Sequence, residues 1–257
     1  MNPAVPPVEI LRQPALAVEA PLQLSGTWFN ELCLWLQCRI GSLGAIGWPM
    51  VLIPEVIDRR FRAWEDALQI YLRATWSAPV PSEPFIVGAE VAWVSSKDGS
   101  LEVGVRSRAV DSESAELATS LLVLRTRGDA GSWGERDVPA LPAVGTLSRR
   151  RSLVIDEGQV RTFAQLAGTK YPVHTDVRYA WARGFPNILV QGHVLAITQL
   201  HFAGVGPSGR SETWFRRPVP AASLLEVCRS QEDESVWAFR LVSTGDVAAV
   251  TRITPGP

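Results

Sequence analysis

The chain has 257 residues, of which 46% are hydrophobic, so it is long enough to bury a sizeable core. Its formal net charge of −1 argues against a nucleic-acid-binding surface. The three cysteines are too few and too widely spaced for a disulfide framework or a metal site, and no apolar stretch reaches membrane-spanning length. We therefore expect a cytoplasmic protein with no metal, no cofactor and no nucleic-acid or membrane partner.

The first half of the chain predicts a strand, helices and then three strands. Residues 1–13 are proline-rich, and the pattern over 16–24 predicts a strand. A long amphipathic helix is predicted to begin at Pro54, which suits a helix start. Its apolar stripe comprises Ile57, Phe61, Trp64, Leu68, Tyr71 and Leu72. Strand-like runs follow at 85–95, 101–110 and 115–125.

The second half repeats this order of elements after a segment rich in glycine and proline. We place the N-terminal half at residues 1–127, the linker at 128–147 and the C-terminal half at 148–257. A strand is predicted at 150–155 and is followed by three helices. Further strands are predicted at 212–218, 224–230, 236–243 and 247–253.

All three histidines lie in one segment between these strands, namely His174, His193 and His201. Asp156 and Gln159 have the spacing of a capping box, which predicts a helix start. From Gly192 onwards the segment is apolar on nearly every side, so we expect a buried helix there. Because histidine exchanges protons near neutral pH, this clustering indicates that the chemistry is located in this segment.

This segment carries a motif of about 30 residues. Its members are Phe163, Ala164, Gly168, Pro172, Val173, His174, Asp176, Tyr179, Ala180, Gly184, Phe185, Ile188 and Gly192. In order and spacing they resemble the hydratase signature of the MaoC-like family. The resemblance implies an α+β double hot-dog fold, in which each half is an antiparallel sheet wrapped around a long central helix. The first half has no recognisable signature, and we interpret it as a degenerate hot-dog that walls a pocket between the halves.

The resemblance also implies an aspartate and a histidine that add or remove water across the double bond of an acyl thioester. His174 matches the histidine of that pair. However, Thr169 stands at the position of the aspartate, Tyr171 replaces the asparagine before the proline, and Gln191 replaces the histidine before the glycine. The departures fall on reactive positions, whereas the scaffold positions are retained.

From these residues we predict a catalytic set and a substrate-binding set. The catalytic candidates are His174 as the acid/base, Thr169 as a hydrogen-bond donor and Gly192, whose backbone N–H at a helix start can polarise a carbonyl. The substrate-binding candidates are Lys170, Tyr171, Gln191, His193 and Phe185. His201, near the end of the helix, is better explained as a structural residue.

Three functions are compatible with this set. The leading hypothesis is a dehydratase-like enzyme repurposed to cyclise or isomerise an unsaturated, polyketide-type acyl chain in secondary metabolism, because positioning alone accelerates such reactions. The second is a hydratase or dehydratase of thioesters, in which Glu90, Asp176 or Glu212 supplies the missing carboxylate. The third is a non-catalytic partner subunit. The expected partner is an acyl-chain substrate, either free or linked to coenzyme A or a carrier protein, and a homodimer is allowed.

Overall fold

The computed structural model describes residues 21–22, 67–77, 85–128, 131–166, 171–206 and 208–256. The strands are β1 (Pro21–Leu22), β2 (Leu68–Trp76), β3 (Phe85–Lys97), β4 (Ser100–Val110), β5 (Glu116–Arg127), β6 (Leu147–Val154), β7 (Gly209–Phe215), β8 (Leu224–Ser230), β9 (Val236–Leu241) and β10 (Val247–Pro255). The helices are α4 (Glu157–Leu166), the short 3₁₀ helix η2 (Pro172–His174), α5 (Val177–Ala182) and α6 (Gly192–Ala203). The predicted start of a helix at Pro54 lies outside these ranges.

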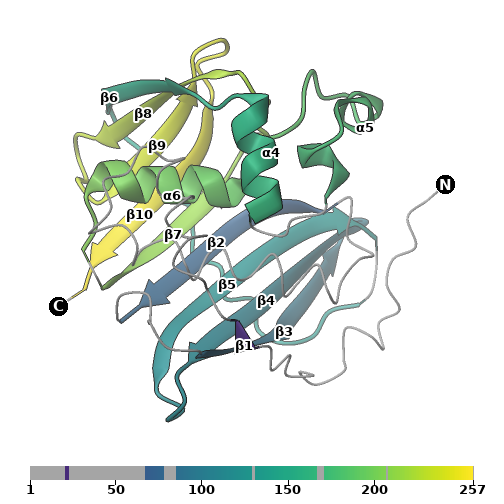
Figure 1. Ribbon diagram of the computed structural model, residues 1–257, viewed down its shortest axis with the longest axis vertical. Helices are drawn as coiled ribbons and strands as arrows, with labels where there is room; N and C mark the ends of the chain where they lie inside the picture. The colour runs from purple at the N-terminus through teal and green to yellow at the C-terminus, as the bar shows by residue number, and fades with distance from the viewer. Residues whose placement is uncertain are drawn as a thin grey trace.

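The strands form one antiparallel sheet in the order β1-β3-β4-β5-β2-β7-β10-β9-β8-β6 (Figure 1). One side of this sheet comes from β1–β5 and the other from β6–β10. The two sides join where β2 pairs with β7, with Tyr71 opposite Trp214 and Arg73 opposite Glu212. The two sheets therefore pack edge to edge.

Helix α6 packs against the strands of the C-terminal side, with contacts to β7, β9 and β10 (Figure 1). Residues 193–200 are all buried, as expected for a helix that is apolar all round. The helix ends at Gly204, which takes the left-handed conformation that favours glycine. None of the helices in the described ranges is both long and apolar enough to cross a membrane.

Strand β2 corrects the prediction that the helix from Pro54 extends to Leu72. Leu68, Tyr71 and Leu72 belong to a strand with hydrogen-bonded neighbours on both edges. Because β2 is central, Tyr71 and Leu72 are both fully buried, one on each face. A strand that is buried on both faces lacks an apolar/polar alternation, and its short apolar run also fits helical spacing.

The strands predicted from residue 85 onwards are present, with some shifted ends, whereas most of the strand predicted over 16–24 lies outside the described residues. Strand β8 has the predicted bounds, whereas β6 begins at Leu147 rather than Arg150. Strand β7 ends at Phe215 and does not reach Pro218. At this end the backbone N–H groups of Arg216 and Arg217 both donate to the carbonyl of Ala248, which interrupts the regular ladder.

Candidate functional site

A pocket with a volume of about 240 Å³ lies where the two sides of the sheet meet. Ala67 and residues 68–70 of β2, together with Leu122, Leu124 and Arg125 of β5, line one wall. The opposite wall comprises Tyr171, Val173, His174, Leu189–Leu195 except Val194, and the segment from Phe215 to Val219. Most of this lining is apolar. The position agrees with the expectation of a pocket between the halves, and the size suits a slender ligand such as an acyl chain.

His174 is fixed in the pocket wall by a hydrogen bond to the backbone. Its Nδ1 atom lies 2.8 Å from the carbonyl oxygen of Leu189. Because a carbonyl oxygen only accepts, Nδ1 carries the proton, and Nε2 of the neutral ring presents a lone pair. Burial lowers the pKa of His174 to about 4, partly offset by the bond to Leu189. The ring is therefore neutral at neutral pH and has the form of a base.

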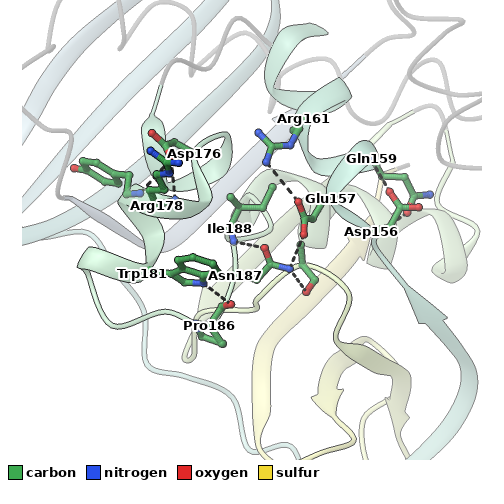
Figure 2. Close-up of polar contacts among 12 residues, drawn as sticks. Asp156, Glu157, Gln159, Arg161, Asp176, Arg178, Trp181, Pro186, Asn187 and Ile188 are labelled. Carbon is green, nitrogen blue, oxygen red and sulfur yellow. Dashed lines mark hydrogen bonds and ion pairs between the residues drawn. The ribbon is translucent and has the colours of Figure 1, made fainter.

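The segment that carries Leu189 is itself held on several sides (Figure 2). Nδ2 of Asn187 donates to Oε1 of Glu157 in α4 at 3.1 Å, and the N–H of Ile188 donates to Oδ1 of Asn187 at 2.8 Å. The N–H of Leu189 donates to the carbonyl of Val173, just before His174. Leu189, which accepts the hydrogen bond from His174, therefore lies in a segment held by several hydrogen bonds.

The start of α6 forms the floor of the same pocket. Gly192 is its first residue, and the first N–H groups of a helix have no partner inside it. A Cβ atom on Gly192 would lie 2.6 Å from Oε1 of Gln69 and 3.0 Å from Cε1 of Phe215. Glycine therefore allows Gln69, from the other side of the sheet, to approach the helix start.

Two flanking residues add polar atoms that have no hydrogen-bond partner within the described part of the chain. Nε2 of Gln191 donates to the carbonyl of Val160 at 3.1 Å, and its Oε1 is buried and unpartnered. Nε2 of His193 is also buried and unpartnered. Burial, followed by the nearby charge of His174, lowers the pKa of His193 to about 3. Both residues line the pocket, whereas His201, at the far end of α6, does not.

Among the remaining predicted site residues, Tyr171 lines the pocket and lies edge-on to His174, with ring centroids 6.5 Å apart. Thr169 and Lys170 lie outside the described residues. Phe185, predicted to bind substrate, is not among the residues that line this pocket. Its N–H donates to Ala180 and that of Gly184 to Trp181, which is a Schellman motif closing α5. This motif turns Phe185 back towards the core, where it packs.

None of the three carboxylates considered as substitutes for the aspartate lines this pocket. Glu90 is exposed on β3 and pairs with Arg106 at 3.5 Å. Asp176 caps α5 by accepting from the N–H of Arg178 at 2.8 Å (Figure 2). The side chain of Asp176 is thus committed to the helix start.

Glu212 is buried on the opposite face of the sheet. Its Oε1 accepts from the Tyr71 hydroxyl at 2.9 Å and from Arg210 at 2.8 Å. Tyr71 packs edge-on against Trp214 in a separate apolar cluster on that face. Burial and the neighbouring charge of Glu212 raise the pKa of Tyr71. This network joins the two sides of the sheet away from the pocket.

Sequence reasoning missed Gln69, which with Arg125 is one of the two polar residues that the described part of the N-terminal side contributes to the pocket. The helical interpretation of β2 concealed it, because on a helix Gln69 would lie among solvent-facing residues. The only available signal was the enrichment of β-branched and aromatic residues from Ile70 to Trp76, which favours a strand.

The sequence matches no protein-family model and no curated protein. Solved structures are nevertheless similar in fold. HtdX of Mycobacterium tuberculosis has a TM-score of 0.74 at 17% identity, covering 91% of this chain and 96% of that chain. A MaoC-like dehydratase has a TM-score of 0.74 at 12% identity, covering 97% and 100%. A conserved hypothetical protein of M. tuberculosis with a double hot-dog fold has a TM-score of 0.63 at 14% identity, covering 96% and 97%.

At these identities the likeness shows the fold. It covers nearly the whole of each chain, so it includes both sides of the sheet. The chain therefore has the α+β double hot-dog fold of the MaoC-like dehydratases.

Proposed function

We propose that this protein is a hydratase or dehydratase of enoyl and hydroxyacyl thioesters, with coenzyme A or acyl carrier protein as the thiol carrier and His174 as the acid/base. The observation that carries the proposal is the hydrogen bond from Nδ1 of His174 to Leu189. It fixes the tautomer that leaves Nε2 unprotonated, inside a largely apolar pocket. The fold shared with MaoC-like dehydratases supports the same reaction class.

The reaction can proceed with a single base. In dehydration, Nε2 of His174 takes a proton from the α-carbon of the acyl chain. The bond between the β-carbon and its hydroxyl then breaks, and the hydroxyl takes that proton and leaves as water. The two carbons become joined by a double bond, and the imidazole returns to its neutral form. Hydration is the same path reversed.

Other groups at the pocket would stabilise this path. The N–H of Gly192 would polarise the thioester carbonyl, because the charge that forms when the α-proton leaves is delocalised onto that oxygen. Gln191 and His193 each have a buried polar atom that no other described residue contacts by a hydrogen bond, and these atoms would hold the departing hydroxyl. We assign Gln191 an accepting role, because its Nε2 is already used on Val160.

The second candidate is isomerisation or cyclisation of an unsaturated acyl chain. One observation favours it: no carboxylate is found among the described residues that line the pocket. Moving a double bond requires only one base, which takes a proton from one carbon and returns it to another. Cyclisation would rest on positioning in the pocket. The polyketide substrate and the setting in secondary metabolism are part of this candidate.

Product mass separates the candidates. Purified protein is incubated with crotonyl-coenzyme A and, separately, with a medium-chain enoyl-coenzyme A. Gain of one water supports the hydratase, whereas a change in retention time at unchanged mass supports the isomerase. Absence of any product from these thioesters and from the matching hydroxyacyl thioesters would contradict the hydratase proposal and favour a non-catalytic partner subunit.

A further inference from the structure

We propose that Gln69, from the N-terminal side of the sheet, is a catalytic residue whose side-chain amide donates a hydrogen bond to the acyl carbonyl oxygen beside the N–H of Gly192. The proposal rests on the proposed function for the reaction, but the carbonyl contact itself can be measured separately. The N-terminal half, which lacks the hydratase signature, would then contribute a residue that contacts the reacting group.

A β-bulge aims Gln69 into the pocket. In the pairing of β2 with β5, Gln69 lies opposite Leu124 and Tyr71 lies opposite Val123, so the register shifts between them. Leu124 belongs to the core on the α6 side, whereas Val123 belongs to the cluster on the other face. In a regular strand Gln69 and Tyr71 would share a face. The bulge instead turns Gln69 towards α6, and bulges that re-aim a side chain are common beside active sites.

The amide of Gln69 lies against the start of α6 and has an unused donor. Its Oε1 and Cδ would be 2.6 and 2.9 Å from a Cβ atom on Gly192, so the amide lies directly beside that residue. Nε2 is buried and has no hydrogen-bond partner among the residues that the structure describes. Leaving a buried donor unpaired destabilises the folded state, so the placement calls for an explanation. An acceptor brought by a ligand would remove this cost.

A thioester carbonyl is the acceptor that suits this position. Its oxygen has two lone pairs and can accept from the N–H of Gly192 and from Gln69 together. The final torsion of a glutamine side chain is soft, so the amide can rotate to direct its N–H at the oxygen. Neither donor carries a charge, and both are held by the fold, as suits stabilisation of a transient enolate.

Two substitutions test the role of Gln69 in turnover. Gln69→Leu keeps most of the volume against Phe215 and removes the donor, whereas Gln69→Glu keeps the shape and presents a carboxylate to the oxyanion. Thr75→Val, at an exposed position on the same strand, is the matched control. We expect both Gln69 variants to lower kcat/KM for crotonyl-coenzyme A by about 10²-fold, with Thr75→Val unchanged and all melting temperatures similar.

A second readout keeps the carbonyl contact separate from the reaction. Butyryl-coenzyme A, which has no double bond to hydrate, is bound with an isotopically labelled carbonyl, and its stretching frequency is measured by infrared spectroscopy. We expect a shift to lower frequency in the wild type that is partly lost in Gln69→Leu. If the wild type turns over no thioester yet shows this shift, the proposed function fails and the contact stands. An identical frequency in both proteins, or no binding of butyryl-coenzyme A to either, overturns the inference.

Discussion

Nδ1 of His174 and the carbonyl oxygen of Leu189 are 2.8 Å apart, and Leu189 donates its own N–H to the carbonyl of Val173. The two bonds cross-link η2 to the segment before α6. The bond from Leu189 to Val173 fixes the backbone of η2, and the bond from His174 to Leu189 fixes the imidazole ring. A histidine so held keeps one tautomer, and its Nε2 keeps the lone pair that a base requires.

The lowered pKa values of His174 and His193 predict a protein that loses stability in acid. In the unfolded chain each of these histidines binds a proton near the ordinary pKa of about 6.5. In the folded chain the ring of His174 stays neutral down to about pH 4 and the ring of His193 down to about pH 3. Between these values the unfolded state holds more protons, so the free energy of unfolding falls as the pH is lowered. We expect a loss of more than about 1 kcal/mol between about pH 7 and pH 5 in urea unfolding.

Histidine variants show which histidines cause this loss of stability in acid. His174→Gln removes a titrating group from the folded interior and should flatten the dependence on pH. His201→Gln is the control, because His201 is less deeply buried and its pKa is lowered chiefly by that partial burial. Equal flattening by both variants would contradict the assignment to the pocket histidines.

Gly192→Ala tests the close approach of Gln69 to α6. The new methyl group would lie 2.6 Å from Oε1 of Gln69, so the amide must move away. Because Oε1 is the end of a flexible side chain, we expect only a small loss of stability in thermal melting but a clear fall in kcat/KM for crotonyl-coenzyme A. The same change in a Gln69→Ala background should cost less. Gly206→Ala is the control, because a Cβ atom there would meet nothing within 4 Å.

Asp176 is predicted to be a helix cap and not a catalytic acid. Asparagine caps a helix as well as aspartate does, so Asp176→Asn should leave both melting temperature and kcat nearly unchanged. Asp176→Ala should lower stability by about 1 kcal/mol. Loss of turnover in Asp176→Asn with the fold intact would restore Asp176 as the substitute carboxylate.

Tyr71→Phe should destabilise the protein without altering the chemistry. It removes the hydroxyl that donates to Glu212 and leaves that buried carboxylate with Arg210. We expect a loss of about 1–3 kcal/mol in urea unfolding. Because the network lies on the face opposite the pocket, kcat per folded molecule should stay within about threefold of wild type. A larger fall in kcat would show that this face is coupled to the site.

Much of the C-terminal side could be predicted because its signals are local. Asp156 and Gln159 form the expected capping box, with the N–H of each accepted by the side chain of the other (Figure 2). The burial of α6 follows from its composition, and Gly184 has the positive φ of a helix stop. Each of these signals is complete within a few residues of sequence.

The errors arose where the deciding contacts are distant in sequence. Whether Leu68–Trp76 is a strand depends on its pairing with β5 and β7, and β7 lies more than a hundred residues further along the chain. The position of Gln69 depends on a bulge, which leaves no clear mark in the sequence. Likewise, the sequence does not show on which face of the sheet β7 presents Glu212, so only the structure shows that Glu212 lies away from the pocket.

The most direct test of His174 as the base is the rate of crotonyl-coenzyme A hydration by wild type and His174→Ala across pH. Wild-type kcat/KM should stay level from about pH 8 down to about pH 5 and fall only near the lowered pKa of about 4. His174→Ala should be slower by about 10²-fold or more between about pH 5 and pH 8 while its fold stays intact, and His201→Ala should match wild type. Hydration by folded His174→Ala at close to the wild-type rate would contradict the account.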